Sequence, residues 1–178
     1  MTLETPIVIA ELAADGLAEH AAELGLLLRD CVHDGASIGF VLPCLAEECE
    51  TFWRDKVLPG VRAGSRLLLI ARAAGRIVGT VQLDFDTPAN QPHRAEVRKL
   101  LVHPGFRRRG ISRALMAELE RHATRLGRSL LTLDTRTGDG AEPLYLSLGY
   151  SAAGIIPGYC LDPECRRLDS TTVMYKAL

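Results

Sequence analysis

The 178-residue sequence lacks several features that would assign it to a specialised class of protein. It has no uninterrupted apolar run near the roughly 18 residues that a membrane-spanning helix requires. Its N-terminus, MTLETPIVIAEL, lacks the basic segment and long apolar core of a secretory signal peptide. Charges nearly cancel, with 21 Lys and Arg residues against 22 Asp and Glu residues, which disfavours a dedicated nucleic-acid binder. We therefore expect neither a membrane nor a nucleic acid as a partner.

Cysteine is scarce, and the count of five is odd, in a chain long enough to bury a core without cross-links. Such a count favours reduced thiols and therefore the cytoplasm. Cys44 and Cys49 are five residues apart, as are Cys160 and Cys165, which is wider than the close pairs of typical metal sites. No metal ion is expected. With 47% hydrophobic and 24% charged residues, the composition is that of an ordinary folded protein.

Hydrophobic periodicity predicts strands alternating with helices, arranged as a mixed α/β domain around one sheet. We expect a single domain over residues 1–178. Helices are predicted from Asp15 to Cys31, from Pro43 until Pro59-Gly60, from Ile111 to Gly127, and over 141–150. Strands are predicted at 5–12, in a hairpin over 65–86, and at 94–102, 129–135, 151–159 and 170–178.

The predicted strand 94–102, RAEVRKLLV, has an irregular pattern of apolar and polar residues. Leu100, Leu101 and Val102 are consecutive, whereas a strand with one buried face alternates. Two explanations remain open, burial of both faces of the strand or a β-bulge within it.

The segment HPGFRRRGIS, residues 103–112, connects this strand to the helix that begins at Ile111. The first N–H groups of a helix have no intrahelical partners, and the helix dipole adds partial positive charge there. Gly110 lets the backbone approach a ligand closely, and Arg107–Arg109 add forked donors suited to phosphate. The segment lacks the Lys-Ser/Thr pair of a P-loop and the extra glycines of a Rossmann motif. We interpret it as a site for a smaller anion.

Two motifs resemble the GNAT N-acetyltransferases. Arg107-x-x-Gly110-x-Ser112 is similar to the family's (Gln/Arg)-x-x-Gly-x-(Gly/Ala), which wraps the pyrophosphate of acetyl-CoA, and LYLSLGY (144–150) resembles its tyrosine-containing helix and following turn. The order of predicted elements is similar as well. From about residue 31 to the C-terminus, four stretches resemble the tabtoxin-resistance acetyltransferase subgroup: DGASIGF, RAEVRKLLVHP, LLTLDT and IPGYC.

The resemblance implies a mixed, mostly antiparallel central sheet flanked by about four helices and splayed between strands four and five. It also implies an acetyl-CoA-dependent N-acetyltransferase whose pantetheine arm lies between the splayed strands. The residues that it implies for CoA binding are the backbone of Leu101, Val102 and His103, and the loop Arg107, Arg108, Arg109, Gly110, Ile111 and Ser112.

Acetyl transfer to an amine needs a base for the amine proton and an acid for the leaving thiolate. Glu96 and Asp134 are the candidate bases, and Tyr145 occupies the place of the family's general acid. Structural roles are the alternatives: Glu96 as an edge-facing strand residue among basic neighbours, Asp134 as a cap of the following turn, and Tyr145 as a core residue. For the acceptor pocket, the candidates are Ser37, Phe40 and Tyr159.

The sequence departs from the family pattern at two positions. Ser112 replaces a glycine or alanine, which places a hydroxyl group beside the expected phosphate site. Gly138 stands where many GNAT enzymes carry an asparagine, so no role of that asparagine is carried over.

The acceptor is predicted to be a small-molecule amine, and the subgroup resemblance implies an amino-acid-like toxin or antibiotic. A protein N-terminus or lysine is an alternative acceptor, and a non-catalytic acyl-CoA-binding regulatory domain is an alternative function. The family resemblance also implies a homodimer formed through the late strands.

Overall fold

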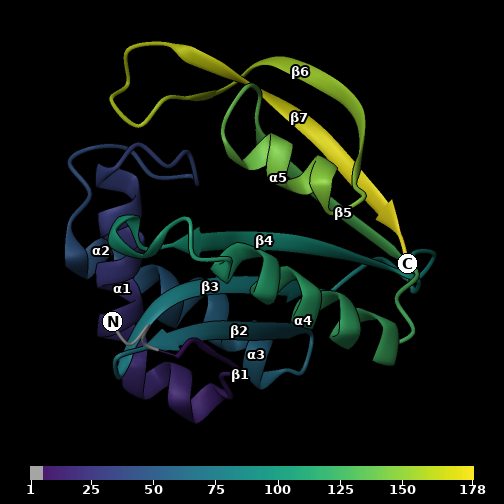
Figure 1. The fold of residues 1–178 in the computed structure, drawn as a ribbon, viewed down its shortest axis with the longest axis horizontal. Coiled ribbons are helices and arrows are strands. Elements are labelled where there is room, and N and C mark those ends of the chain that lie inside the picture. Colours follow the sequence, from purple (N-terminus) through teal and green to yellow (C-terminus); the bar gives the residue numbers. More distant parts are fainter. Residues whose placement is uncertain (1–5) are drawn as a thin grey trace, which may run out of the picture.

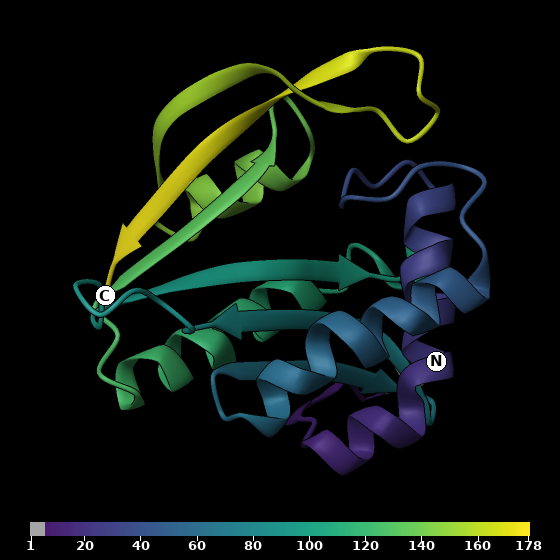
Figure 2. The same ribbon diagram turned by 180° about the vertical axis from the view of Figure 1, so that it is seen from behind.

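The computed structural model describes residues 6–178, which form a seven-stranded sheet with helices on both faces (Figure 1 and Figure 2). The strands lie in the order β1-β2-β3-β4-β5-β7-β6, and each neighbouring pair is antiparallel except β4 and β5. This arrangement confirms the predicted mixed, mostly antiparallel sheet. The strands are β1 (Val8–Glu11), β2 (Arg66–Ala73), β3 (Arg76–Asp84), β4 (Arg94–Val102), β5 (Leu130–Arg136), β6 (Ser151–Leu161) and β7 (Leu168–Ala177).

The helices lie close to their predicted positions, with one correction. The helix expected to end at Pro59-Gly60 continues to Arg62, as α2, a π-helical turn over Trp53–Val57, and α3. Pro59 lies in the first turn of α3, where its missing N–H costs least, so the proline does not end the helix. No helix within residues 6–178 is both long and apolar enough to cross a bilayer. The α-helices are α1 (Ala14–His33), α2 (Ala46–Phe52), α3 (Leu58–Arg62), α4 (Ile111–Arg125) and α5 (Ala141–Ser147).

The sheet separates two hydrophobic layers. Helix α4 packs on one face through buried residues that include Leu115 and Leu119. Helices α1, α2 and α3 cover the other face, where Leu24 and the fully buried Trp53 belong to the second layer. Each residue of the central strands therefore points either toward α4 or toward α1.

A β-bulge in β4 explains the irregular pattern of 94–102. Lys99 has a φ of +50°, and the register against β3 shifts at this point. Before the bulge Val97 packs with the α4 layer, whereas after it Val102 does so and Leu101 packs with the α1 layer. The second of the two sequence-based explanations, a bulge, thus accounts for the consecutive apolar residues.

Strands β4 and β5 pair over a short stretch and then separate. Their parallel register covers Arg94–Glu96 opposite Leu130–Thr132, and the remaining residues of β4 face no strand on this side. In Figure 1, β5, β7, β6 and α5 lean away from β4 as one group, with the C-terminus near the point of convergence. The predicted splay between strands four and five is confirmed, and it opens a cavity through the sheet.

Candidate active site

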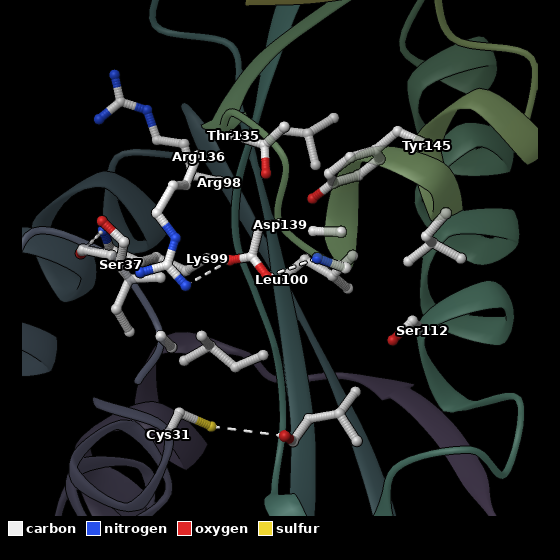
Figure 3. Close-up of a pocket in the computed structure, with 18 of the residues that line it drawn as sticks. Cys31, Ser37, Arg98, Lys99, Leu100, Ser112, Thr135, Arg136, Asp139 and Tyr145 are labelled. Atoms are coloured by element: carbon white, nitrogen blue, oxygen red, sulfur yellow. Dashed lines mark hydrogen bonds and ion pairs between the residues drawn. The ribbon is translucent and has the colours of Figure 1, made fainter. Parts of the chain in front are cut away.

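A cavity of about 1100 Å³ occupies the gap between β4 and β5 (Figure 3). The loop before α4 and the helix α5 line one end, and the loop after α1 together with β6 lines the other. Most of the residues predicted for the site line this cavity: Ser37, Glu96, Leu101, Val102, Arg107, Arg108, Gly110, Ile111, Ser112, Asp134, Tyr145 and Tyr159.

The start of α4 lies at one end of the cavity and has the geometry of an anion-binding site. Gly110 precedes the first turn with a φ of +77°, and no atom lies within 4 Å of the position that a Cβ would take. No side chain of the described residues caps this helix, so its first N–H groups are free to bind a ligand. Arg108 and Ser112 line the cavity beside them.

Arg107 is held in place at the rim of this end. Its guanidinium donates to the Asp34 carboxylate and, through Nε, to the Val102 carbonyl at 3.3 Å. Because Asp34 follows α1 and Val102 ends β4, this arginine ties the anion-binding loop to both elements.

Two residues predicted to bind CoA do not reach the cavity. The backbone N–H of His103 donates to the Val78 carbonyl at 2.9 Å, so it belongs to the β3–β4 ladder. The guanidinium of Arg109 lies over the Phe106 ring, 5.0 Å from its centroid, and neither His103 nor Arg109 lines the cavity. Strand pairing in one case and a cation–π contact in the other hold these groups elsewhere.

Tyr145 lies on α5 and directs its hydroxyl into the cavity (Figure 3). The residue is 7% exposed, and its ring packs edge to face with Tyr150 at a centroid distance of 5.6 Å. Burial and the nearby charge of Asp134 raise the pKa of Tyr145 well above its usual value. The phenol therefore stays protonated near neutral pH and can donate a proton.

The two candidate bases face the same cavity from the two strands of the gap. Glu96, on β4, forms an ion pair with Arg98, with an Nε–Oε1 distance of 3.1 Å. Asp134, inside β5, accepts a hydrogen bond from Thr171 Oγ1 at 3.0 Å. Asp134 is bonded across the sheet in this way and does not cap the turn into α5.

At the opposite end of the cavity, two segments that are distant in the sequence contact each other. Ser37 Oγ, in the loop after α1, lies 3.7 Å from Cys160 Sγ of β6. The Leu42 N–H of the same loop donates to the Pro163 carbonyl, beyond β6, at 2.7 Å. Phe40 does not line the cavity as predicted, because its ring packs on Phe52 at 5.4 Å and joins the α1 layer.

Several charged residues of the cavity were not predicted from the sequence. Lys99 Nζ, at the β4 bulge, donates to the Ile38 carbonyl at 2.6 Å. Arg136, at the end of β5, pairs with Asp139 at 3.0 Å. The irregular pattern of 94–102 was the one signal that marked Lys99, whereas nothing in the sequence marked the Arg136 pair.

The fold and the cavity together define a class of protein. A sheet opened between two parallel strands, with a free helix N-terminus at one end and carboxylates within, is suited to transfer between an anionic donor and a second substrate. Residues 40–150 match the model of the acetyltransferase (GNAT) family, and the chain belongs to this family. It is therefore an acyltransferase, an acetyl-CoA-dependent N-acetyltransferase.

Solved structures of similar fold agree with this assignment. A protein of Acinetobacter baylyi ADP1 is 19% identical over 100% of this chain and 95% of its own, with a TM-score of 0.80. The ribosomal-protein-alanine N-acetyltransferase of Brucella melitensis is 21% identical over 96% and 99%, with a TM-score of 0.75. A Salmonella typhimurium protein solved with its cofactor acetyl-CoA is 16% identical over 98% and 95%, with a TM-score of 0.76.

The residues of this chain fit acetyl-CoA, the donor that the family uses. The space above Gly110 leaves room for a phosphate group at the free N–H groups of α4. Arg108, on the same loop, supplies compensating charge, whereas the charge of Arg107 is paired with Asp34. The gap beside β4 leads from this loop to Tyr145, so a long donor can reach the carboxylates.

Proposed function

We propose that the protein transfers the acetyl group of acetyl-CoA to the amine of a small molecule by direct attack of the amine. The observation that carries this proposal is the cavity through the sheet, with an anion-binding loop at one end and Glu96 and Asp134 within it. Bound acetyl-CoA supplies the activated acetyl thioester. The chain supplies orientation, a proton acceptor and a proton donor.

Each predicted catalytic residue has a proposed part in proton transfer. Glu96 or Asp134 accepts the proton of the attacking amine, since both carboxylates line the cavity from either side of the gap. Tyr145 delivers a proton to the departing thiolate, and its hydroxyl faces the cavity in Figure 3. The neutral phenol that burial favours is the form needed for this role.

A small acceptor is favoured over a protein N-terminus or a protein lysine. The acceptor end, which we define as the end of the cavity lined by Ser37 and Cys160, is narrowed where Ser37 Oγ lies 3.7 Å from Cys160 Sγ. A polypeptide acceptor would require an open groove there. The stretches that resemble the tabtoxin-resistance subgroup support an amino-acid-like toxin or antibiotic, and five free cysteines support a cytoplasmic enzyme.

The test is calorimetric titration of acetyl-CoA into the native protein and into a Gly110→Glu variant. A carboxylate at this position would occupy the phosphate space and repel the phosphates, so we expect affinity to fall by about tenfold or more. A release assay for free thiol over a panel of amines then tests turnover. Absence of acetyl-CoA binding by the native protein would refute the proposed function.

Gly75→Glu is the matched control for backbone strain. Gly75 has a φ of +76°, almost the same as the +77° of Gly110, and open space around its Cβ position. It lies in the turn between β2 and β3, away from the cavity. Equal loss of affinity in both variants would mean that strain, and not the phosphate space, explains the result.

A further inference from the structure

Lys99 is a cation in the wall of the acceptor end that has no carboxylate partner among the described residues. Its ammonium donates to the Ile38 carbonyl at 2.6 Å and lies 5.4 Å from the centroid of the Phe52 ring. Three neighbouring arginines differ, because each forms an ion pair: Arg98 with Glu96, Arg107 with Asp34, and Arg136 with Asp139. An ammonium has three donors, so Lys99 keeps donor capacity for a ligand.

The position of Lys99 follows from the β4 bulge. The bulge directs its side chain toward the loop after α1, on the face of the sheet opposite α4. The anion-binding loop for CoA lies on the α4 side, so Lys99 is placed for the second substrate and not for the phosphates of the donor. In Figure 3 Lys99 and Ser37 lie on the wall opposite Tyr145 and Ser112.

The charge of Lys99 is not balanced by a carboxylate in contact with it, and Arg98 adds a second positive charge nearby. Burial and the charge of Arg98 lower the pKa of Lys99, although Asp134 and Glu96 oppose this effect from a distance. Lys99 is half-buried and has no anionic partner among the described residues, so a bound anion would compensate its charge. The site thus offers a positive group in the wall and two carboxylates further along the cavity.

We propose that the acceptor is an amine that also carries a carboxylate, and that Lys99 binds this carboxylate. The inference rests on the proposed function and narrows the acceptor to an amino acid or a close analogue. The ammonium group of such a molecule would lie toward Glu96 and Asp134, while its carboxylate replaces solvent at Lys99. Ser37, which lines the same wall, offers a further hydroxyl donor.

A structural role of Lys99 predicts a different result from a recognition role. As a structural residue, Lys99 would hold the loop after α1 through Ile38, and its loss would impair every acceptor alike. As a recognition residue, its loss would impair carboxylate-bearing acceptors selectively. Lys99→Gln separates the two, because the glutamine amide keeps a donor for Ile38 but carries no charge.

The experiment compares free amino acids with their amides as acceptors for the native enzyme and for Lys99→Gln. The amide keeps the amine and loses the carboxylate, and the comparison between enzymes cancels the intrinsic reactivity of each amine. We expect the native preference for the acid over the amide, measured as kcat/KM, to fall by about ten- to hundredfold in the variant. The change should lie in KM for the acid, and Lys99→Arg should restore part of the preference. Lys56→Gln, an exposed lysine outside the cavity, is the matched control.

The outcomes separate this inference from the proposed function. Acetyl-CoA binding with turnover of amides or peptides but not of acids would overturn the role of Lys99 and leave the acetyltransferase function intact. An equal loss for acids and amides in Lys99→Gln would also overturn it, as would acetyl-CoA binding with no acid acetylated. Absence of acetyl-CoA binding would instead refute the proposed function itself.

Discussion

At the scale of single residues, the cavity is organised by which charged and polar groups already have partners. Arg107 is fixed by Asp34 and Glu96 by Arg98, so these groups are oriented before any ligand binds. Tyr145 and Lys99 differ from these residues. The Tyr145 hydroxyl faces the cavity, and the Lys99 ammonium donates only to the Ile38 carbonyl. Pre-oriented groups position substrates, whereas groups with spare hydrogen-bonding capacity are available to contact them.

Tyr145→Phe tests the proposed proton donor. The substitution keeps the ring that packs on Tyr150 and removes the hydroxyl that faces the cavity. We expect kcat to fall by about 10²-fold, the lower end of the usual range for a general acid, because the thiolate would leave unprotonated. Affinity for acetyl-CoA should stay within about twofold by calorimetry, since the proposed phosphate site is the loop before α4 and not α5.

Tyr150→Phe is the control for the loss of a neighbouring hydroxyl. Tyr150 is buried beside Tyr145 but does not line the cavity. Its variant should turn over as the native enzyme does. If Tyr145→Phe retained native kcat, the general-acid assignment would be wrong; an equal loss in both variants would indicate a packing effect.

The residues that line the cavity were predicted best where a local sequence motif determines the backbone position. Gly110 and Ser112 line the cavity at the start of α4, where free helix N–H groups give a physical reason to expect an anion site. The position of His103 outside the cavity could not be predicted, since the pairing of its N–H with Val78 depends on strand register. Lys99 was missed for the same reason: its direction follows from a bulge whose exact position the residue pattern does not fix.

At the scale of elements, the anion site depends on how closely α4 approaches β3. Gly79 of β3 makes this approach possible, because a Cβ there would lie 3.0 Å from the Leu101 carbonyl oxygen. The same Cβ would lie 3.1 Å from Ile111 and 3.2 Å from Leu115, at the beginning of α4. The glycine in a central strand is therefore explained by close packing against a helix.

Gly79→Val should destabilise the fold and displace the start of α4. Overpacking at this contact is expected to lower the free energy of unfolding by about 1–3 kcal/mol, measured by urea denaturation. Binding of acetyl-CoA should weaken as well, since Ile111 belongs to the first turn of α4. Native stability in Gly79→Val would contradict the close packing.

The order of helices and strands was predictable from the sequence, because the hydrophobic periodicity and the glycine and proline residues between elements agree along most of the chain. The helix 111–125 ends before Gly127, whose φ of +69° suits a helix terminus. Continuation of α3 through Pro59 was not predictable from the proline alone, since it depends on the preceding π-helical turn. The splay of β4 and β5 came from the family resemblance, because no local pattern reports where two distant strands separate.

At the scale of the whole molecule, strand β6 leaves one edge of the sheet without a neighbouring strand. It forms one edge of the sheet, and its eleven residues, SAAGIIPGYCL, include no charge. Ile155 is 59% exposed and Ile156 is 45% exposed, so both faces of the strand are open. Natural edge strands without charges are normally covered, because they otherwise promote aggregation. We propose that a second copy of the chain covers this edge.

Light scattering coupled to gel filtration tests the dimer. We expect the native protein to have twice its chain mass of 19.4 kDa, and Ile155→Lys to be monomeric because a charge would be buried at the interface. Leu126→Lys, at an exposed leucine that follows α4, is the control and should remain dimeric. A native protein of monomer mass would refute the proposal.

Dimer formation should also affect the acceptor end of the cavity. Tyr159 and Cys160 line the cavity from β6, the strand that the second copy would cover. Covering β6 would restrict the motion of this wall, whereas the anion-binding loop lies on another element. The monomeric Ile155→Lys variant should therefore show a higher KM for the acceptor and an unchanged Kd for acetyl-CoA. An equal KM for the acceptor in the monomeric variant and the native dimer would contradict an effect of the dimer on the β6 wall of the cavity.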